Sequence, residues 1–194
     1  MNPTRLFIDA GHGGRDHGVV WQNGNRVLKE SDICLTLAYL LRLTLQKNSY
    51  NPVLLRSRDR YMPELFRIMR INDNRLFSMC AISLHMDADV NSTTRGFQVL
   101  FNANEIKSRF IARGIVGNLV SLVDREDILP RKQGIYPGES KFLSKVQIPS
   151  VVINLGYITN SSDRDFLSSR GLMLFSDAIS SYLLSDSFRG MITE

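Results

Sequence analysis

The sequence lacks any run of about 18 apolar residues, which excludes a membrane-spanning helix. It also has no apolar stretch behind a basic start, as a secretory signal would require. Three explanations for the missing signal therefore stay open: export by other means, action inside the cell, or a chain that begins after a removed leader. Internal repeats, low-complexity segments and linkers rich in Pro, Gly and Ser are absent as well. We therefore predict that residues 1–194 form one domain.

Cysteine is scarce, because the chain has only Cys34 and Cys80. Two cysteines are too few for a disulfide framework. Cys34 falls in a helical pattern and Cys80 in an apolar strand run, so we expect two buried thiols that act as small hydrophobic side chains.

Acidic residues are outnumbered: 24 Lys and Arg against 19 Asp and Glu give a formal charge of +5. Such an excess favours polyanionic partners, and nucleic acid and anionic cell-wall polymers qualify equally. However, the basic residues are spread along the chain without a dense tract, as on an ordinary solvated surface. Nucleic-acid binding would rest on charge alone, with no motif behind it.

Short apolar runs alternate with longer helical patterns, which predicts an α/β fold. We expect a mostly parallel twisted sheet flanked by helices on both faces. The predicted strands are residues 5–9, 51–56, 79–85, 96–101 (nearer the edge) and 149–154. The predicted helices are residues 29–47, 62–77, 108–123 and 171–184. Residues 124–145 are expected to form a surface loop.

Three polar residues fall where such a fold would place a site. His12 follows the first strand, His85 closes the central strand, and Glu30 opens the first long helix. Sites in parallel sheets form at the carboxyl ends of strands, so these residues can converge. Two imidazoles and one carboxylate are the ligand set of a catalytic zinc with a fourth position for water. We expect Asp9 and Asp87 to orient a ligating imidazole.

Each of these residues also has an ordinary structural explanation. A single histidine at a strand end is commonly a hydrogen-bonded structural residue. Glu30 is of a residue type favoured in the first turn of any helix. From spacing alone, a zinc site and a purely structural role both stay open.

The segment FIDAGHGGRDHG resembles the opening signature of the zinc-dependent N-acetylmuramoyl-L-alanine amidases of the amidase-3 (AmiC-like) family. Further segments agree in order. KESDICLTLAYLL resembles the family's ligand-bearing helix, VLLRSRD its Thr-Arg-x-x-Asp strand exit, and AISLHMDA its Ser-x-His-x-Asn-Ala strand. IPSVVINLGYITNSSDRDFL resembles its Pro-x-Val-Leu-Val-Glu-x-Gly-Phe-x-Ser-Asn-x-x-Asp strand and turn. The resemblance covers nearly the whole chain.

The resemblance implies a specific chemistry. The family hydrolyses the amide between the lactyl group of N-acetylmuramic acid and the L-alanine of the stem peptide, by zinc-activated water. Its zinc ligands correspond to His12, Glu30 and His85, and its catalytic glutamate falls on Asn154. Residues 1–194 would then be an amidase-3-like catalytic domain acting on the cell wall, of the kind found in phage-type lysins or as an isolated domain.

Asn154 is the main departure from the family pattern. Its amide cannot act as a base at neutral pH, and such proton transfer typically contributes about 10²–10⁴-fold to the rate. Three explanations stay open: a natural or engineered knockout, a substitute acid such as Asp87 or His17, or a protein that binds cell-wall fragments without turnover. We expect an amidase with attenuated chemistry.

A second departure is a missing insertion. The resemblance implies that many secreted members have a helix that blocks the zinc until a partner removes it. Only the segment NANEI separates residue 101 from the helix expected near residue 107, too short for another helix. We therefore expect an open site, no activator, and a monomer whose partner is peptidoglycan or its muropeptides.

Overall fold

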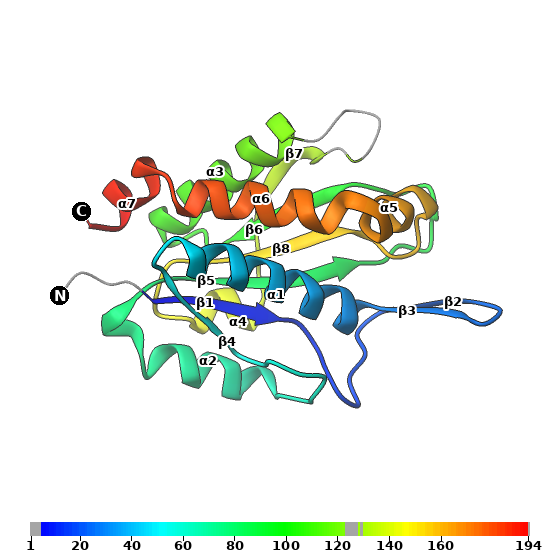
Figure 1. Ribbon diagram of the computed structural model, residues 1–194, viewed down its shortest axis with the longest axis horizontal. Helices are drawn as coiled ribbons and strands as arrows, with labels where there is room; N and C mark the ends of the chain where they lie inside the picture. Colours follow the sequence, from blue (N-terminus) through cyan, green and yellow to red (C-terminus); the bar gives the residue numbers. More distant parts are fainter. Residues whose placement is uncertain (1–4, 123–127, 129, 194) are drawn as a thin grey trace.

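A six-stranded sheet forms the centre of the computed structural model, which describes residues 5–122, 128 and 130–193 (Figure 1). The order of the strands is β4-β1-β5-β8-β6-β7. Their bounds are β1 Arg5–Ala10, β4 Asn51–Leu54, β5 Ser78–Asp87, β6 Phe97–Phe101, β7 Pro130–Pro137 and β8 Ser150–Tyr157. Strands β4, β1, β5 and β8 run parallel, whereas β6 pairs antiparallel with β8 and parallel with β7. The prediction of a mostly parallel sheet is confirmed.

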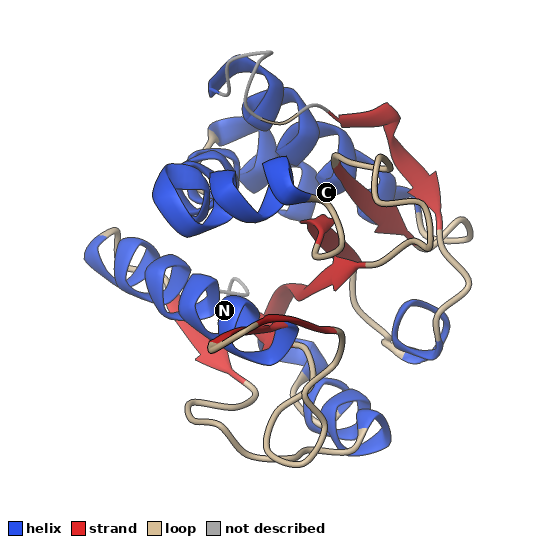
Figure 2. Ribbon diagram, turned by 90° about the vertical axis from the view of Figure 1, so that its right-hand side faces the viewer, coloured by secondary structure: helices blue, strands red, loops and turns tan. Residues whose placement is uncertain are grey.

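Helices cover both faces of the sheet (Figure 2). One face packs against α1 (Glu30–Lys47), α3 (Ile106–Leu122) and α6 (Leu172–Leu183), and the other against α2 (Glu64–Asn72) and α4 (Lys141–Lys145). The remaining helical segments are a 3-10 turn at Arg75–Phe77, α5 (Ser161–Phe166), a π-helical turn at Leu167–Gly171, and α7 (Asp186–Thr193). Each face therefore has its own apolar core.

The central strand β5 shows how the two faces are divided. Cys80, Ile82 and Leu84 belong to the core under α1, whereas Ala81 belongs to the core under α2 and α4. Side chains alternate along a strand, so His85 lies on the α2/α4 side with Ala81. Burial on both faces explains why β5 is a continuous apolar run in the sequence.

The predicted loop at residues 124–145 is partly wrong. Within it the structure has β7 and α4, while residues 123–127 and 129 lie outside the described part of the chain. Strand β7 lies at the edge of the sheet, with β6 as its neighbour. Its sequence, PRKQGIYP, is polar and has no apolar run from which a strand could be predicted. Helix α4 has five residues, which is too short for a helical period to be recognised.

Three further differences concern local structure. A hairpin of β2 (Val20–Asn23) and β3 (Arg26–Lys29) was not predicted and extends beyond the N-terminal end of α1 (Figure 1). The helix predicted at residues 62–77 is divided into α2 and the 3-10 turn. The last predicted helix corresponds to α6, with further helical segments on either side.

The two cysteines are as predicted: both are free and fully buried. Burial raises the pKa of the Cys34 thiol and of the Cys80 thiol well above the usual range. Among the described residues, the helices are too short or too polar to cross a membrane.

Candidate metal centre

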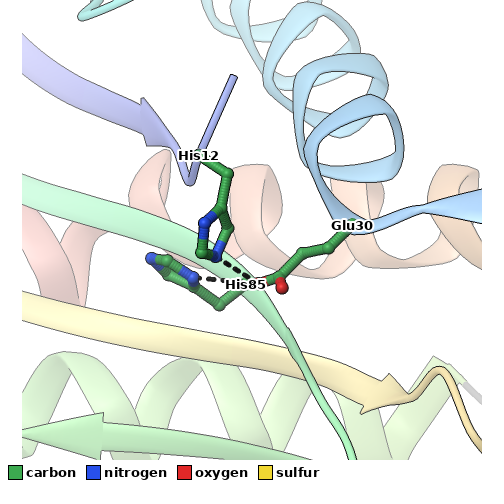
Figure 3. Close-up of side chains that lie close together, drawn as sticks. All are labelled: His12, Glu30 and His85. Atoms are coloured by element: carbon green, nitrogen blue, oxygen red, sulfur yellow. Dashed lines mark hydrogen bonds and ion pairs between the residues drawn. The ribbon is translucent and has the colours of Figure 1, made fainter. Parts of the chain in front are cut away.

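His12, Glu30 and His85 come together at one end of the sheet (Figure 3). His12 lies in the loop after β1, Glu30 is the first residue of α1, and His85 belongs to β5. The Oε1 atom of Glu30 is 3.1 Å from His12 Nε2 and 3.0 Å from His85 Nδ1. The two imidazole rings meet edge to face, with centroids 5.1 Å apart. The structure therefore brings together the three predicted ligands.

Glu30 is the most buried member of this cluster, with 2% of its surface exposed. Its Oε2 accepts a hydrogen bond from the backbone N–H of Val19, and its Oε1 accepts one from that of Met86, both at 2.9 Å. Burial opposes ionisation of Glu30, but hydrogen bonds from His12 and His85 outweigh it, so the pKa of this carboxyl lies well below its usual range. The carboxylate is thus charged and fixed in position.

His12 lies between two carboxylates. Its Nε2 faces Glu30, and its Nδ1 is 2.9 Å from Asp16 Oδ1. The hydrogen bond to Glu30 raises the pKa of His12, against the opposing effect of burial. Carboxylate oxygens only accept hydrogen bonds, so a protonated imidazole can donate to both of these neighbours. A metal ion would replace the Nε2 proton and leave the bond to Asp16 intact.

Asp16 was missed by the sequence analysis. It also accepts from the N–H of Gly18, at 3.1 Å, so its carboxylate is held inside the glycine-rich loop. A partner on the second ring nitrogen is what a metal-ligating histidine usually has. The only sequence signal was a carboxylate four residues after His12. Because the loop folds back through a Gly13–Asp16 bridge, this contact could not be predicted from local periodicity.

The roles predicted for Asp9 and Asp87 require correction. Asp9 forms a buried ion pair with Arg67 and accepts a hydrogen bond from Ser83 Oγ at 2.8 Å. Asp87 Oδ2 accepts from Gln98 Nε2 at 3.0 Å and from Asn154 Nδ2 at 3.4 Å. Both carboxylates thus have hydrogen-bond partners other than the imidazoles, and Asp16 is a carboxylate outside the predicted set that contacts one.

Two buried arginines hold the loop that contains His12. Arg56 donates to the carbonyls of Ala10 and Gly11, both at 2.8 Å. Arg67 donates to the carbonyl of His12 at 2.6 Å. The planar guanidinium suits this task, because it offers several donors in a fixed geometry. These bonds fix a backbone in which His12 has a φ of 59°, a strained conformation for a residue with a side chain.

Glycine is required where this loop approaches the ligands. Gly18 has a φ of +65°, and a Cβ there would overlap Glu30 Oε2 and lie 2.6 Å from His12 Cδ2. A Cβ at Gly11 would lie 2.5 Å from His85 Cε1. The glycines around His12 therefore allow the close packing of the three ligands.

The separation of the ligand atoms fits a small divalent cation. Tetrahedral bonds of about 2.0–2.1 Å place neighbouring donor atoms about 3.3 Å apart. The nitrogen–oxygen distances of 3.0 and 3.1 Å are close to this value, and one donor atom of each residue lies within 4.8 Å of the others. The three residues thus form a group with the geometry to bind a metal ion.

The cluster opens onto a cavity of about 270 Å³ on the α2/α4 side of the sheet. His12 and His85 line it together with residues at the start of α2, Phe142 of α4 and the residues around the ends of β1 and β5. The guanidinium of Arg15 lies 4.4 Å from the centre of the Tyr61 ring at this wall. The cavity is lined by Asp9, Gly11, His12, Asp16, Tyr61, Met62, Glu64, Arg67, Ser83, His85 and Phe142.

Asn154 lies beside His85, because the two residues are paired in the parallel ladder of β5 and β8. Its side chain is partly exposed and donates to Asp87. His17, the other residue considered as a substitute acid, is not among the residues that line the cavity. Its backbone carbonyl instead accepts a hydrogen bond from the N–H of Ser31 in α1.

Comparison with known proteins identifies one family. The profile of the Amidase_3 family, described as N-acetylmuramoyl-L-alanine amidase, matches residues 6–180. The protein YqiI of Bacillus subtilis is 34% identical over 168 residues, which are 84% of this chain and 75% of YqiI. The probable cell wall amidase LytH of Staphylococcus epidermidis is 26% identical over 170 residues, or 86% of this chain and 53% of LytH. The chain thus spans about half the length of LytH.

Solved structures agree with this result. An N-acetylmuramoyl-L-alanine amidase from Clostridium difficile 630 superimposes with a TM-score of 0.82 at 25% identity, over 95% of this chain and 96% of that one. AmiC2 of Nostoc punctiforme gives 0.82 at 24% identity, over 93% and 94%. The CwlD amidase of Clostridioides difficile, solved in complex with the GerS lipoprotein, gives 0.81 at 21% identity, over 96% and 98%.

Proposed function

This chain belongs to the N-acetylmuramoyl-L-alanine amidase family of peptidoglycan hydrolases, and we propose that residues 1–194 act as one zinc-dependent catalytic domain. Its substrate would be the amide between the lactyl group of N-acetylmuramic acid and L-alanine in peptidoglycan or muropeptides. The observation that supports this most directly is the cluster of His12, Glu30 and His85 at the end of a cavity. The protein would act at the cell wall.

The three ligands would hold the zinc ion and leave a position open towards the cavity. A zinc ion bound there would supply Lewis acidity for the scissile carbonyl and lower the pKa of a coordinated water to about 7. Asp16 keeps the His12 ring oriented with Nε2 towards Glu30. Tyr61 and Phe142 would line the cavity on the side facing the substrate.

The reaction would be slow because Asn154 cannot accept a proton at neutral pH. We expect Asn154→Glu to raise the rate by about 10²–10⁴-fold, the usual contribution of a positioned acid–base group. The measurement is muropeptide release, or dye release from labelled cell walls, at equal zinc content. Asn104→Glu, which introduces the same charge at an exposed loop position, is the matched control. No gain with Asn154→Glu would contradict the assignment of that position.

A second candidate is a peptidoglycan-binding or regulatory module without turnover, and the amide at position 154 favours it. Both candidates predict binding to cell walls, so binding does not distinguish them. Metal analysis combined with hydrolysis does. Zinc at one equivalent and measurable release of muropeptides support the amidase, whereas wall binding without any release supports the module.

We further propose an open site that needs no activator, in a monomeric protein without nucleic-acid partners. Helix α3 starts at Ile106, and the connection from β6 is the loop of residues 102–105, with no inserted helix. The complex of CwlD with GerS is a property of that protein. Hydrolysis by the purified chain at its monomeric mass would support the proposal. Activity that rises sharply only with an added partner would contradict it.

A further inference from the structure

Three carboxylates line the cavity beside the candidate metal ligands: Asp9, Asp16 and Glu64. Asp9 is balanced by its buried ion pair with Arg67, which lines the same cavity. Asp16 is paired with His12, at 2.9 Å. The carboxylate of Glu64 has no hydrogen bond or ion pair with any residue in the described part of the chain. Glu64 is therefore the carboxylate of this wall that is free to bind a ligand.

The charges around the cavity leave Glu64 without a counterion. Asp9 and Arg67 cancel each other. A zinc ion at the proposed site would be balanced by the carboxylates of Glu30 and Asp16. An acid in the first turn of a helix also has a structural explanation, because it interacts favourably with the helix dipole. That explanation predicts an effect of Glu64 on stability, whereas a binding role predicts an effect on the choice of substrate.

Apolar side chains share this wall with Glu64. Tyr61 and Met62 come just before it in the chain, and Phe142 of α4 lines the same cavity. The guanidinium of Arg15 lies over the Tyr61 ring, but Arg15 does not line the cavity and forms no ion pair with Glu64 among the described residues. A long alkyl chain that ends in an ammonium group fits such a wall, because the chain packs on apolar surface and the charged end reaches the carboxylate.

We propose that Glu64 binds the free side-chain ammonium group of a diamino acid in the stem peptide. The preferred substrates are then stem peptides whose amine is not cross-linked. This proposal rests on the proposed amidase function, which places the scissile amide beside His12 and His85. Two residues of extended chain span about 7 Å, and a round cavity of about 270 Å³ is roughly 8 Å across. The side chain of the third stem residue can therefore reach the wall that contains Glu64.

Cross-linking gives the test its chemical contrast, because it converts the ammonium group into a neutral amide. Two muramyl tripeptides that differ only in the amine of a lysine at the third position, free or acetylated, compete in one reaction. The ratio of their kcat/KM values is measured for the native chain and in the Asn154→Glu background. We expect the free amine to be preferred by about 3–10-fold at low salt, as for a partly exposed charged pair. Added salt should reduce this preference.

Two substitutions at position 64 change the charge stepwise. Glu64→Gln should abolish the preference, and Glu64→Lys should reverse it. Asp177 is an exposed residue of α6, which covers the other face of the sheet. Asp177→Asn and Asp177→Lys make the same changes in net charge and should keep the preference. An equal effect of Asp177→Lys would overturn the proposal, because it would assign the preference to overall charge and not to contact with Glu64.

Binding to the metal-free chain gives a readout that does not require hydrolysis. In calorimetry the muramyl tripeptide with the free amine should bind more tightly than the acetylated one, and Glu64→Gln should remove the difference. A lower Tm of Glu64→Gln with an unchanged difference would leave only the helix-dipole role and overturn the proposal. A third compound has an acetylated lysine and a free amine on the sugar. Tighter binding of this compound would place the ammonium group on the glycan and overturn its assignment to the stem peptide.

The outcomes separate this inference from the proposed function. Hydrolysis of both tripeptides with equal kcat/KM by the native chain would support the amidase and overturn the role of Glu64. If neither the native chain nor Asn154→Glu hydrolyses any muramyl tripeptide, the proposed amidase function fails, and calorimetry alone decides whether Glu64 binds the amine. If Glu64→Lys does not fold, the loss of preference in Glu64→Gln decides the matter.

Discussion

The site has two halves that differ in how tightly they are built. In the ligand half, Glu30 is 2% exposed and lies 3.0–3.1 Å from both imidazoles, with two backbone donors behind it. In the half formed by β5, β8 and β6, the partly exposed Asp87 accepts hydrogen bonds from the amides of Gln98, at 3.0 Å, and Asn154, at 3.4 Å. The candidate metal ligands and the side chains of β5, β8 and β6 beside them thus depend on different contacts, and a change in one half can leave the other intact.

Removal of the shared carboxylate should have the largest effect. Glu30→Gln must place an NH₂ group against one of the two backbone donors, which costs about 1–3 kcal/mol of unfolding free energy. It also removes the charge between the imidazoles. We expect zinc binding and hydrolysis to disappear together, measured by metal analysis and by the loss of any rise in Tm on adding zinc. Glu139→Gln, an exposed position, should bind zinc normally.

A methyl group at Gly18 should disturb the ligand half without changing a ligand. Gly18→Ala and Gly24→Ala both force a side chain into a positive φ, at about 1–2 kcal/mol of unfolding free energy. Only at Gly18 does the new Cβ overlap Glu30, whereas the space at Gly24 is open. Zinc titration should therefore show weaker binding for Gly18→Ala only. Equal zinc affinities of the two variants would show that the close packing at Gly18 is irrelevant to the site.

Loss of the bond between His12 and Asp16 should have a smaller effect. Asp16→Asn leaves the ligands in place but weakens the orientation and basicity of the imidazole, so we expect zinc affinity to fall by about 10–100-fold. Competition with a chelator measures this. Asp165→Asn, which lies on the exposed side of α5, is the control. An unchanged zinc affinity in Asp16→Asn would show that Asp16 does not contribute to metal binding.

The smallest predicted effect is on pH dependence. The raised pKa of His12 stabilises the metal-free fold below about pH 6.5, and this contribution is lost as the pH rises through the raised value. The lowered pKa of Glu30 stabilises the fold above about pH 4.5, and this contribution is lost only in stronger acid. A zinc ion at this site would compete with a proton for Nε2 of His12. The rise in Tm on adding zinc should therefore be larger at pH 8 than at pH 6, and the opposite order would contradict the bound proton.

The parts of the fold predicted from sequence are those with a strong local pattern. Helix α1 has an apolar stripe, and β5 is buried on both faces, so periodicity and composition identified both. The β2–β3 hairpin is short and exposed, and its signal was only the Gly24-Asn25 turn. Strand β7 was missed because it is held by pairing with β6. The polar sequence of β7 has no pattern from which this pairing could be predicted.

In the candidate site, too, some residues were predicted from the sequence and others were not. His12, Glu30 and His85 were found because the ends of parallel strands and the starts of helices meet at one edge. Asp16 was missed and Asp9 was misassigned, because which carboxylate reaches an imidazole depends on how a glycine-rich loop folds back. The partner of Asp9 is Arg67, which lies in α2, far along the chain, and forms a buried ion pair with it. This pairing could not be predicted from the sequence around Asp9.

The sequence by itself determined the layered α/β architecture, the family and the three residues that converge, because these follow from local periodicity, chain order and motif. Only the tertiary structure decided which carboxylates orient the ligands and that Asp87 is bound by the amides of Asn154 and Gln98. The physical reason is that hydrogen bonds of about 3 Å between side chains on different elements depend on the register of strands and the path of loops. Neither is encoded in a single segment.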